Sequence, residues 1–126
     1  MALTTQIAPD EMAPRMCGCT FCRKHPAMWF ADPAGKLELR LSNNVNRYQF
    51  GSKTADFVLC GTCGTVLAAT CTIEGADYGI LNLNCIDLSR DWPLPSAKSD
   101  FDGEGVGDRL ARRARNWMAL ETSSAQ

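Results

Sequence analysis

Residues 56–72 read DFVLCGTCGTVLAATCT, two apolar runs with a pair of cysteines between them. Asp56–Leu59 and Thr65–Thr72 are rich in the apolar and β-branched residues that favour strands. Gly64 follows the second cysteine and can adopt the positive φ that a turn around a metal often needs. The stretch therefore predicts a β-hairpin that is closed by the Cys60-Gly61-Thr62-Cys63 turn.

Short strands separated by turn residues are predicted on both sides of this hairpin. The segment Lys36–Leu41 alternates polar and apolar residues, which is typical of a strand with one solvent-exposed face. The other predicted strands are Ala27–Ala31, Arg47–Phe50 and Tyr78–Leu88. Because the strands follow one another as hairpins and do not alternate with helices, we expect a mostly β, antiparallel domain.

The two ends of the chain carry different signals. Residues 1–15 contain prolines and no helical or strand period, so they predict an irregular lead-in. The stretch 91–107 is rich in proline, glycine and acidic residues and predicts a loop. Residues 108–120 predict a C-terminal helix with an apolar stripe, capped by Asp108, whose arginines mostly face solvent. Residues 121–126 are predicted to fray.

Composition bounds the class of protein. A chain of 126 residues is the size of one domain, which we place at 1–126. The formal net charge of -1 indicates no general attraction to nucleic acid or to an anionic membrane. No apolar run approaches the roughly 20 residues of a membrane-spanning helix, so we expect a soluble, cytoplasmic protein. The seven cysteines cannot all pair, and in a reducing cytosol their spacing favours a metal over disulfides.

The densest group of metal ligands is Cys17, Cys19 and Cys22, and we expect zinc as the cofactor. Zinc prefers thiolates in a tetrahedral array, and cysteines a few residues apart on a turn can reach one ion. Two arrangements are open. The three thiols could hold a catalytic ion with one open position, or Cys19, Cys22, Cys60 and Cys63 could form a closed structural site.

Three other candidates have simpler interpretations. His25 could be a fourth ligand or a proton shuttle, but it is interpreted as a partly exposed turn residue. Cys71 and Cys85 fall within predicted strands, lack metal-ligand spacing and are interpreted as core residues. The arginines of the C-terminal helix are interpreted as its solvent-exposed face and not as a nucleic-acid surface.

Several motifs follow one another along the chain: Cys17-x-Cys19-x-x-Cys22-Arg23-Lys24, then Tyr48-Gln49-Phe50-Gly51-Ser52-Lys53-Thr54-Ala55, then Cys60-x-Thr62-Cys63-Gly64, then Leu83-Asn84-Cys85. In this order they resemble the signatures of the glutathione-dependent formaldehyde-activating family, which includes the centromere protein V-like proteins. The resemblance runs from about Cys17 to Leu88. It implies the family's β-rich fold, called a β-tent.

The resemblance also implies roles for the cysteines. It places a catalytic zinc on Cys17, Cys19 and Cys22, where glutathione would add to formaldehyde. It assigns Cys60 and Cys63 to a structural zinc whose other two ligands come from an upstream C-x-C-G motif. Arg23 and Lys24, beside the first motif, could then bind the carboxylates of the anionic tripeptide.

The upstream C-x-C-G motif is absent from this sequence. The strand that carries it would lie before Met1, so we expect the chain to be truncated at its N-terminus or to begin at an internal start. Cys60 and Cys63 would then stay without metal, recruit thiols from the first motif, or be completed by a partner chain. A missing first strand would also expose a sheet edge, through which copies of the chain could pair as a homo-oligomer.

Two functions follow from these alternatives. The first is a zinc-thiolate enzyme resembling carbon-sulfur lyases, which adds glutathione or a similar thiol to formaldehyde or another small aldehyde. The second is a non-catalytic, zinc-stabilised β module for protein interaction. An open three-thiolate site favours the enzyme, whereas a closed four-thiolate site favours the module.

Overall fold

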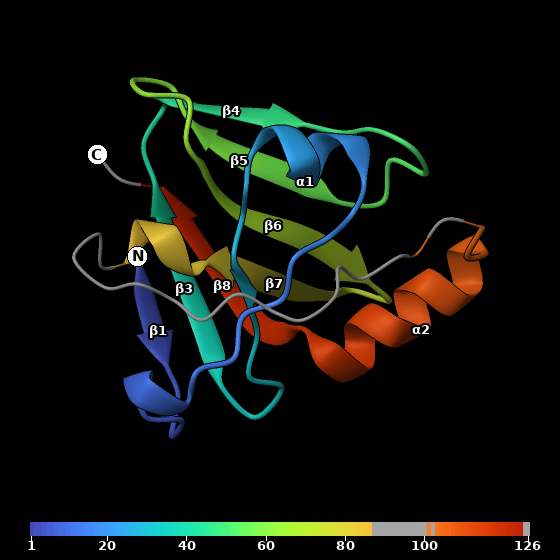
Figure 1. Cartoon of the computed structure of the whole chain (residues 1–126), viewed down its shortest axis with the longest axis horizontal. Coiled ribbons are helices and arrows are strands. Elements are labelled where there is room, and N and C mark those ends of the chain that lie inside the picture. Colours follow the sequence, from blue (N-terminus) through green and yellow to red (C-terminus); the bar gives the residue numbers. More distant parts are fainter. Residues whose placement is uncertain (87–100, 102, 125–126) are drawn as a thin grey trace.

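The computed structural model describes residues 1–86, 101 and 103–124, and in this part of the chain a single sheet of eight strands dominates. The strand order is β1-β3-β8-β7-β6-β5-β4, and β2 pairs with β7 off this path. The strands are β1 (Ala2–Thr4), β2 (Trp29–Phe30), β3 (Lys36–Leu41), β4 (Val45–Tyr48), β5 (Asp56–Cys60), β6 (Val66–Ile73), β7 (Ala76–Asn82) and β8 (Met118–Ser124). The α-helices are α1 (Thr20–Lys24) and α2 (Val106–Asn116). Figure 1 shows α1 over the β4–β5 side of the sheet and α2 beside one end of β6 and β7.

The hairpin predicted from residues 56–72 is present. Strands β5 and β6 pair antiparallel, with a register shift between Val58 and Leu59. Gly64 adopts a φ of 77° in the turn, as its position predicts. Strand β3 has the predicted bounds, and its alternation places Leu37 and Leu39 in the core. The mostly β class is therefore confirmed.

The prediction of an antiparallel sheet is wrong at one pair. Strands β3 and β8 are parallel, with Lys36 opposite Ala119 and Leu41 opposite Ser124. The sheet is consequently mixed. Strand β8 follows α2 and runs beside β3 in the same direction. Parallel strands cannot be joined by a tight hairpin and need a longer connection, which here includes α2.

The predictions for both ends of the chain are also wrong in part. The helix begins at Val106 and ends at Asn116, before the predicted 120, and residues 118–124 form β8 in place of the predicted frayed tail. Pairing with β3 overrides a local sequence of low strand propensity. Residues 1–15 are not wholly irregular, because β1 pairs with β3 and a short 3-10 helix spans Pro9–Glu11.

Three predicted strands differ in their bounds. The predicted strand Ala27–Ala31 is shortened to β2, and the predicted strand Arg47–Phe50 is displaced to β4. The predicted strand 78–88 ends at Asn82, where a 3-10 helix, Leu83–Cys85, begins. The Asn82 side chain accepts a hydrogen bond from the Asn84 N–H and so caps this turn. Residues 87–88, and most of the predicted loop 91–107, lie outside the described residues.

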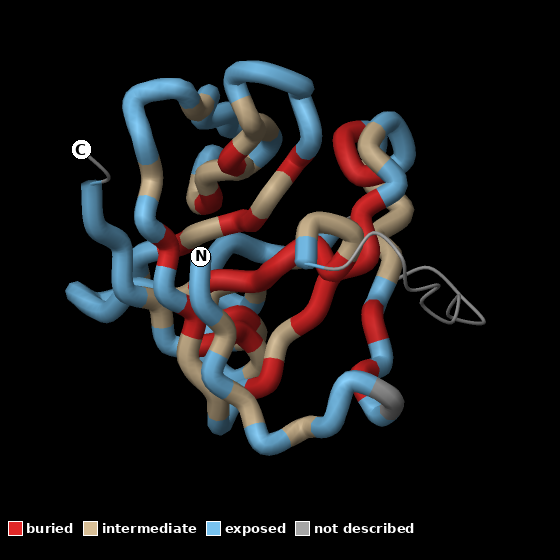
Figure 2. Tube along the Cα trace, turned by 90° about the vertical axis from the view of Figure 1, so that its left-hand side faces the viewer, coloured by how far each residue is buried: buried red, intermediate tan, exposed pale blue. Residues whose placement is uncertain are grey.

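Buried residues are concentrated in the middle of the trace (Figure 2) and form two clusters. One contains Leu37, Leu81 and Met118, each with no exposed surface. The other contains Phe21 of α1 and Trp117 at the end of α2, with Trp29 and strand residues of β6. This second cluster lies under both helices, and it supports the site described next. No helix in the described ranges is long and apolar enough to span a membrane.

Candidate metal and ligand site

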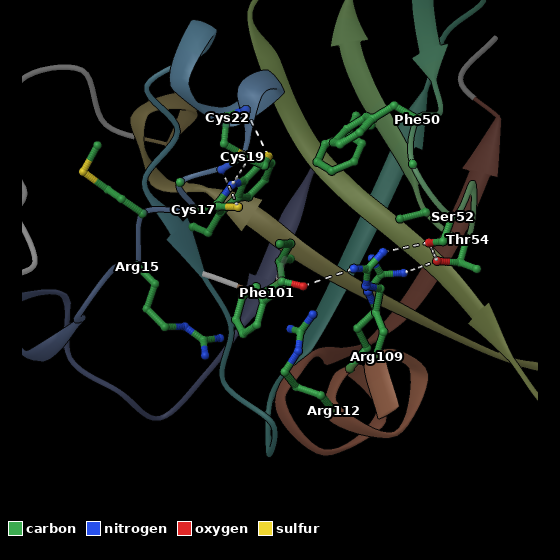
Figure 3. Close-up of a pocket in the computed structure, with 18 of the residues that line it drawn as sticks. Arg15, Cys17, Cys19, Cys22, Phe50, Ser52, Thr54, Phe101, Arg109 and Arg112 are labelled. Atoms are coloured by element: carbon green, nitrogen blue, oxygen red, sulfur yellow. Dashed lines mark hydrogen bonds between the residues drawn. The ribbon is translucent and has the colours of Figure 1, made fainter. Parts of the chain in front are cut away.

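A cavity of about 470 Å³ lies between the two helices, and the first group of cysteines lines it. Its other walls come from the turn after β4, from β5 and β7, and from α2 with Phe101. Figure 3 shows these elements converging, with the cysteines on one side and arginines on the other. Residues far apart in the sequence therefore meet at one place.

The sulfur atoms of Cys17, Cys19 and Cys22, here called the three-thiol cluster, all lie within 4.8 Å of one another. The fold holds them by backbone contacts. The Cys19 N–H donates to Cys17 Sγ at 3.4 Å, and the Cys22 N–H donates to Cys19 Sγ at 3.4 Å. The second contact caps the N-terminus of α1. The cluster can hold a metal ion, because soft thiolate ligands converge on one point.

Trp29 adds a contact from the core side. Its indole Nε1–H donates to Cys22 Sγ at 3.4 Å, and both residues are buried. Trp29 lies in β2, which pairs with β7, so the sheet fixes the depth of Cys22. The cluster is thus attached to the sheet as well as to its own turn.

Without a metal, the three thiols differ in acidity. A hydrogen bond with Cys22 lowers the pKa of Cys17 to about 6, against the opposing effect of burial. The same hydrogen bond, together with burial, raises the pKa of Cys22. Burial raises the pKa of Cys19. In the metal-free protein, Cys17 is therefore the most acidic thiol of the cluster.

Arginines form the opposite wall of the cavity, which corrects their interpretation as solvent-facing. Arg109, Arg112 and Arg113 of α2 line the cavity, and Arg113 is only 9% exposed. A sequence signal was available, because positions 109, 112 and 113 are spaced i, i+3, i+4 and share one helix face. Arg15, which precedes the three-thiol cluster, lines the same cavity.

Two of these arginines hold the cavity together. Arg109 donates from Nη1 to Ser52 Oγ at 3.0 Å and from Nη2 to the Phe101 carbonyl at 3.3 Å. Arg113 donates from Nη1 to Thr54 Oγ1 at 2.8 Å. The turn after β4 is thereby connected to α2.

The charged residues predicted beside the cluster are divided by the structure. Arg23 is exposed and lines the cavity, whereas Lys24 is exposed and is not part of the lining. His25 is partly exposed, as predicted, and its ring lies 4.5 Å from that of Phe21. It does not line the cavity.

Cys60 and Cys63 lie on the hairpin turn and are not part of the three-thiol cluster. The Thr62 N–H donates to Cys60 Sγ at 3.4 Å, and Cys63 Sγ lies 3.1 Å from Thr65 Oγ1. Within the described residues, the closed site of Cys19, Cys22, Cys60 and Cys63 is therefore not assembled.

The remaining two cysteines lie in different surroundings. Cys71 is 4% exposed, as its interpretation as a core residue predicts. Cys85 is only partly buried and donates to the Val66 carbonyl at 3.3 Å. Burial raises the pKa of Cys85, and the charges of Cys63 and Cys60 raise it further. Cys85 is thus a neighbour of the hairpin turn, and not an ordinary core residue.

Comparison with known proteins assigns no family to the chain. No family model matches the sequence. No curated protein matches it either. Among solved structures, the chain is similar to a crystal structure of a Rhodobacter sphaeroides protein, with 23% sequence identity and a TM-score of 0.47. The similarity covers 74% of this chain and 90% of that one.

Proposed function

We propose that this protein is a zinc-thiolate enzyme, similar to carbon-sulfur lyases, which adds glutathione or a related thiol to formaldehyde or another small aldehyde. The observation that carries the proposal is the three-thiol cluster on the wall of a ligand-sized cavity. Small-molecule sites commonly enclose about 300–1,000 Å³, and the cavity of about 470 Å³ lies in this range. Metal ligands and space for a substrate therefore adjoin.

The donor set fits zinc. Zinc–sulfur bonds of about 2.3 Å place tetrahedral sulfurs roughly 3.8 Å apart. The sulfurs of the cluster lie within 4.8 Å of one another, so small side-chain movements suffice. Three protein ligands leave a fourth position for a substrate. Zinc bound there would supply a Lewis acid that stabilises an incoming thiol as its thiolate and polarises a carbonyl.

The surrounding side chains have separate roles. Trp29 Nε1 donates to Cys22 Sγ and fixes the orientation of that ligand. Phe50, Phe57 and Trp117 line the cavity with apolar surface, which would limit the access of water to a substrate thiolate bound there. Such exclusion strengthens the electrostatic interactions inside the site.

The proposed reaction is an addition that needs no oxidant. The thiol gives up its proton, and its sulfur forms a bond to the aldehyde carbon. The carbonyl π electrons move to oxygen, which takes up a proton. The product is a hemithioacetal, which is S-hydroxymethylglutathione when the substrates are glutathione and formaldehyde.

The test is a rate measurement on zinc-loaded protein. Carbon-13 formaldehyde and glutathione would be mixed, and NMR exchange spectroscopy would give the rate of adduct formation. We expect a rate above that of the protein-free mixture and its loss in Cys17→Ser. Cys85→Ser, a change outside the cavity, is the matched control and should retain the rate. Equal rates with and without wild-type protein would refute the proposal.

A further inference from the structure

The arginines that line the cavity, here called the arginine wall, carry more positive charge than the neighbouring carboxylates can balance. The cavity lining includes five arginines and no Asp or Glu among the described residues: Arg15, Arg23, Arg109, Arg112 and Arg113. Glu104 pairs with Arg109 and Arg112 from outside the lining. One carboxylate cannot balance this charge, and a partly enclosed cationic cavity attracts anions.

Arg112 is held in a fixed orientation. Its Nε donates to Glu104 Oε2 at 3.0 Å and its Nη2 donates to Glu104 Oε1 at 3.1 Å. Its guanidinium carbon lies 3.6 Å from the centre of the Phe101 ring. These contacts occupy one edge and one face of the guanidinium group. Within the described residues, Nη1 has no hydrogen-bond partner, and a planar donor fixed in this way loses little entropy when it binds a carboxylate.

Arg15 approaches the same region from the chain segment before the three-thiol cluster. Figure 3 shows Arg15 and Arg112 extending toward the cavity, with the Phe101 ring between them in this view. Both side chains carry a positive charge, and both line the same cavity. An anion that contacts both guanidinium groups would relieve their repulsion.

A second polar group of the wall is unsatisfied. Arg113 Nε is buried and has no hydrogen-bond partner within the described residues, although its Nη1 bonds to Thr54. The Arg113 side chain lines the cavity, and the residue is only 9% exposed. Buried groups without partners are costly and commonly mark a position that a ligand or water completes.

From this geometry we propose that Arg112 and Arg15 form a carboxylate subsite of the cavity, so that the thiol substrate is one that carries a carboxylate. The subsite and the three-thiol cluster line one cavity, and a short molecule with a thiol and a carboxylate can reach both. This inference rests on the proposed function for the thiol end of the ligand. Lys24, which was predicted to bind a carboxylate, does not line the cavity, so the main contact with the carboxylate is assigned to Arg112 of α2.

The test measures binding separately from catalysis. The probe is S-methylglutathione, a thioether that keeps both carboxylates, and its diethyl ester is the uncharged comparison. Titration calorimetry on the zinc-loaded full chain should detect binding of S-methylglutathione, and the diethyl ester should bind more weakly. Arg112→Gln should weaken binding of the acid by about 10- to 100-fold, the effect of one lost charge-assisted bond. Arg115→Gln is the matched control, because Arg115 is exposed on the same helix and does not line the cavity.

A second variant guards against misfolding of Arg112→Gln. Arg15 is exposed, and its backbone N–H and carbonyl make the contacts with Trp29, so Arg15→Gln should fold normally and also weaken binding. Equal binding of acid and ester, or equal affinities of Arg112→Gln and Arg115→Gln, would overturn the subsite. Binding of the acid without catalysis would refute the proposed function alone. Equal catalysis with glutathione and neutral 2-mercaptoethanol would refute the subsite alone.

Discussion

Replacement of Asn82 by alanine should destabilise the fold strongly, because one buried side chain joins three parts of the chain. Asn82 is 3% exposed. Its Oδ1 accepts from the Met28 N–H at 3.1 Å and from the Asn84 N–H at 3.2 Å, and its Nδ2 donates to the Val66 carbonyl at 2.9 Å. Asn82→Ala removes all three hydrogen bonds.

The expected loss is about 3 kcal/mol in the free energy of unfolding. A buried donor left without a partner costs about 1–3 kcal/mol, and Met28 is only 5% exposed. The Val66 carbonyl keeps its contact with Cys85 Sγ and contributes less. Asn84 is partly exposed, so water can replace its lost partner. The buried Met28 N–H therefore dominates the estimate.

The assay is urea unfolding of reduced, metal-free protein, followed by tryptophan fluorescence. Asn46→Ala is the control, because Asn46 is an exposed residue of β4 and most exposed substitutions change stability by less than about 0.5 kcal/mol. Met28 precedes Trp29, so Asn82→Ala should also disturb the Trp29 contact with Cys22. A loss below about 1 kcal/mol, similar to that of Asn46→Ala, would refute the reasoning.

Three further predictions concern the turns that carry the cysteines. In metal-free protein, iodoacetamide should modify Cys17 at half its maximal rate near pH 6, since the pKa of Cys17 is lowered to about 6 and the reactive thiolate is lost below that pH. Peptide mass spectrometry reports the modified site. A midpoint near pH 9 would contradict the hydrogen bond between Cys17 and Cys22. Cys60→Ser should fold and keep the ion of the three-thiol cluster, measured by metal analysis, whereas loss of all metal and of cooperative unfolding would support the closed structural site. Gly61→Ala should cost about 1–3 kcal/mol in urea unfolding, because the new methyl group would lie 2.8 Å from the Asn44 carbonyl. Gly107→Ala is the control, because among the described residues no atom outside the helix backbone lies within 4 Å of the added methyl group. Equal stability of the two variants would be the contrary result.

The features predicted well from the sequence depend on neighbouring residues. The hairpin of β5 and β6 follows from two apolar runs and a glycine that adopts positive φ between them. The three-thiol cluster likewise needs only a tight turn and the first turn of α1, because its members are two and three residues apart. Local spacing is sufficient for both features.

The features that were missed depend on pairing between distant segments. Strand β8 contains Glu121 and serines and has low intrinsic strand propensity, yet β3 provides a complete ladder beside it. The arginine wall is oriented by contacts such as Arg113 with Thr54, which are 59 residues apart. Helical spacing alone gives the shared face of the three arginines, but not the element that this face contacts.

The most direct test of the account is the ligand set of the metal ion at the three-thiol cluster. Zinc-loaded Cys60→Ser/Cys63→Ser protein isolates this cluster from the hairpin turn, and X-ray absorption at the zinc edge counts the ligands. The account predicts one ion per chain with three sulfur ligands at about 2.3 Å and one oxygen or nitrogen ligand. A site with four sulfur ligands, or no stoichiometric zinc in this variant, would contradict it.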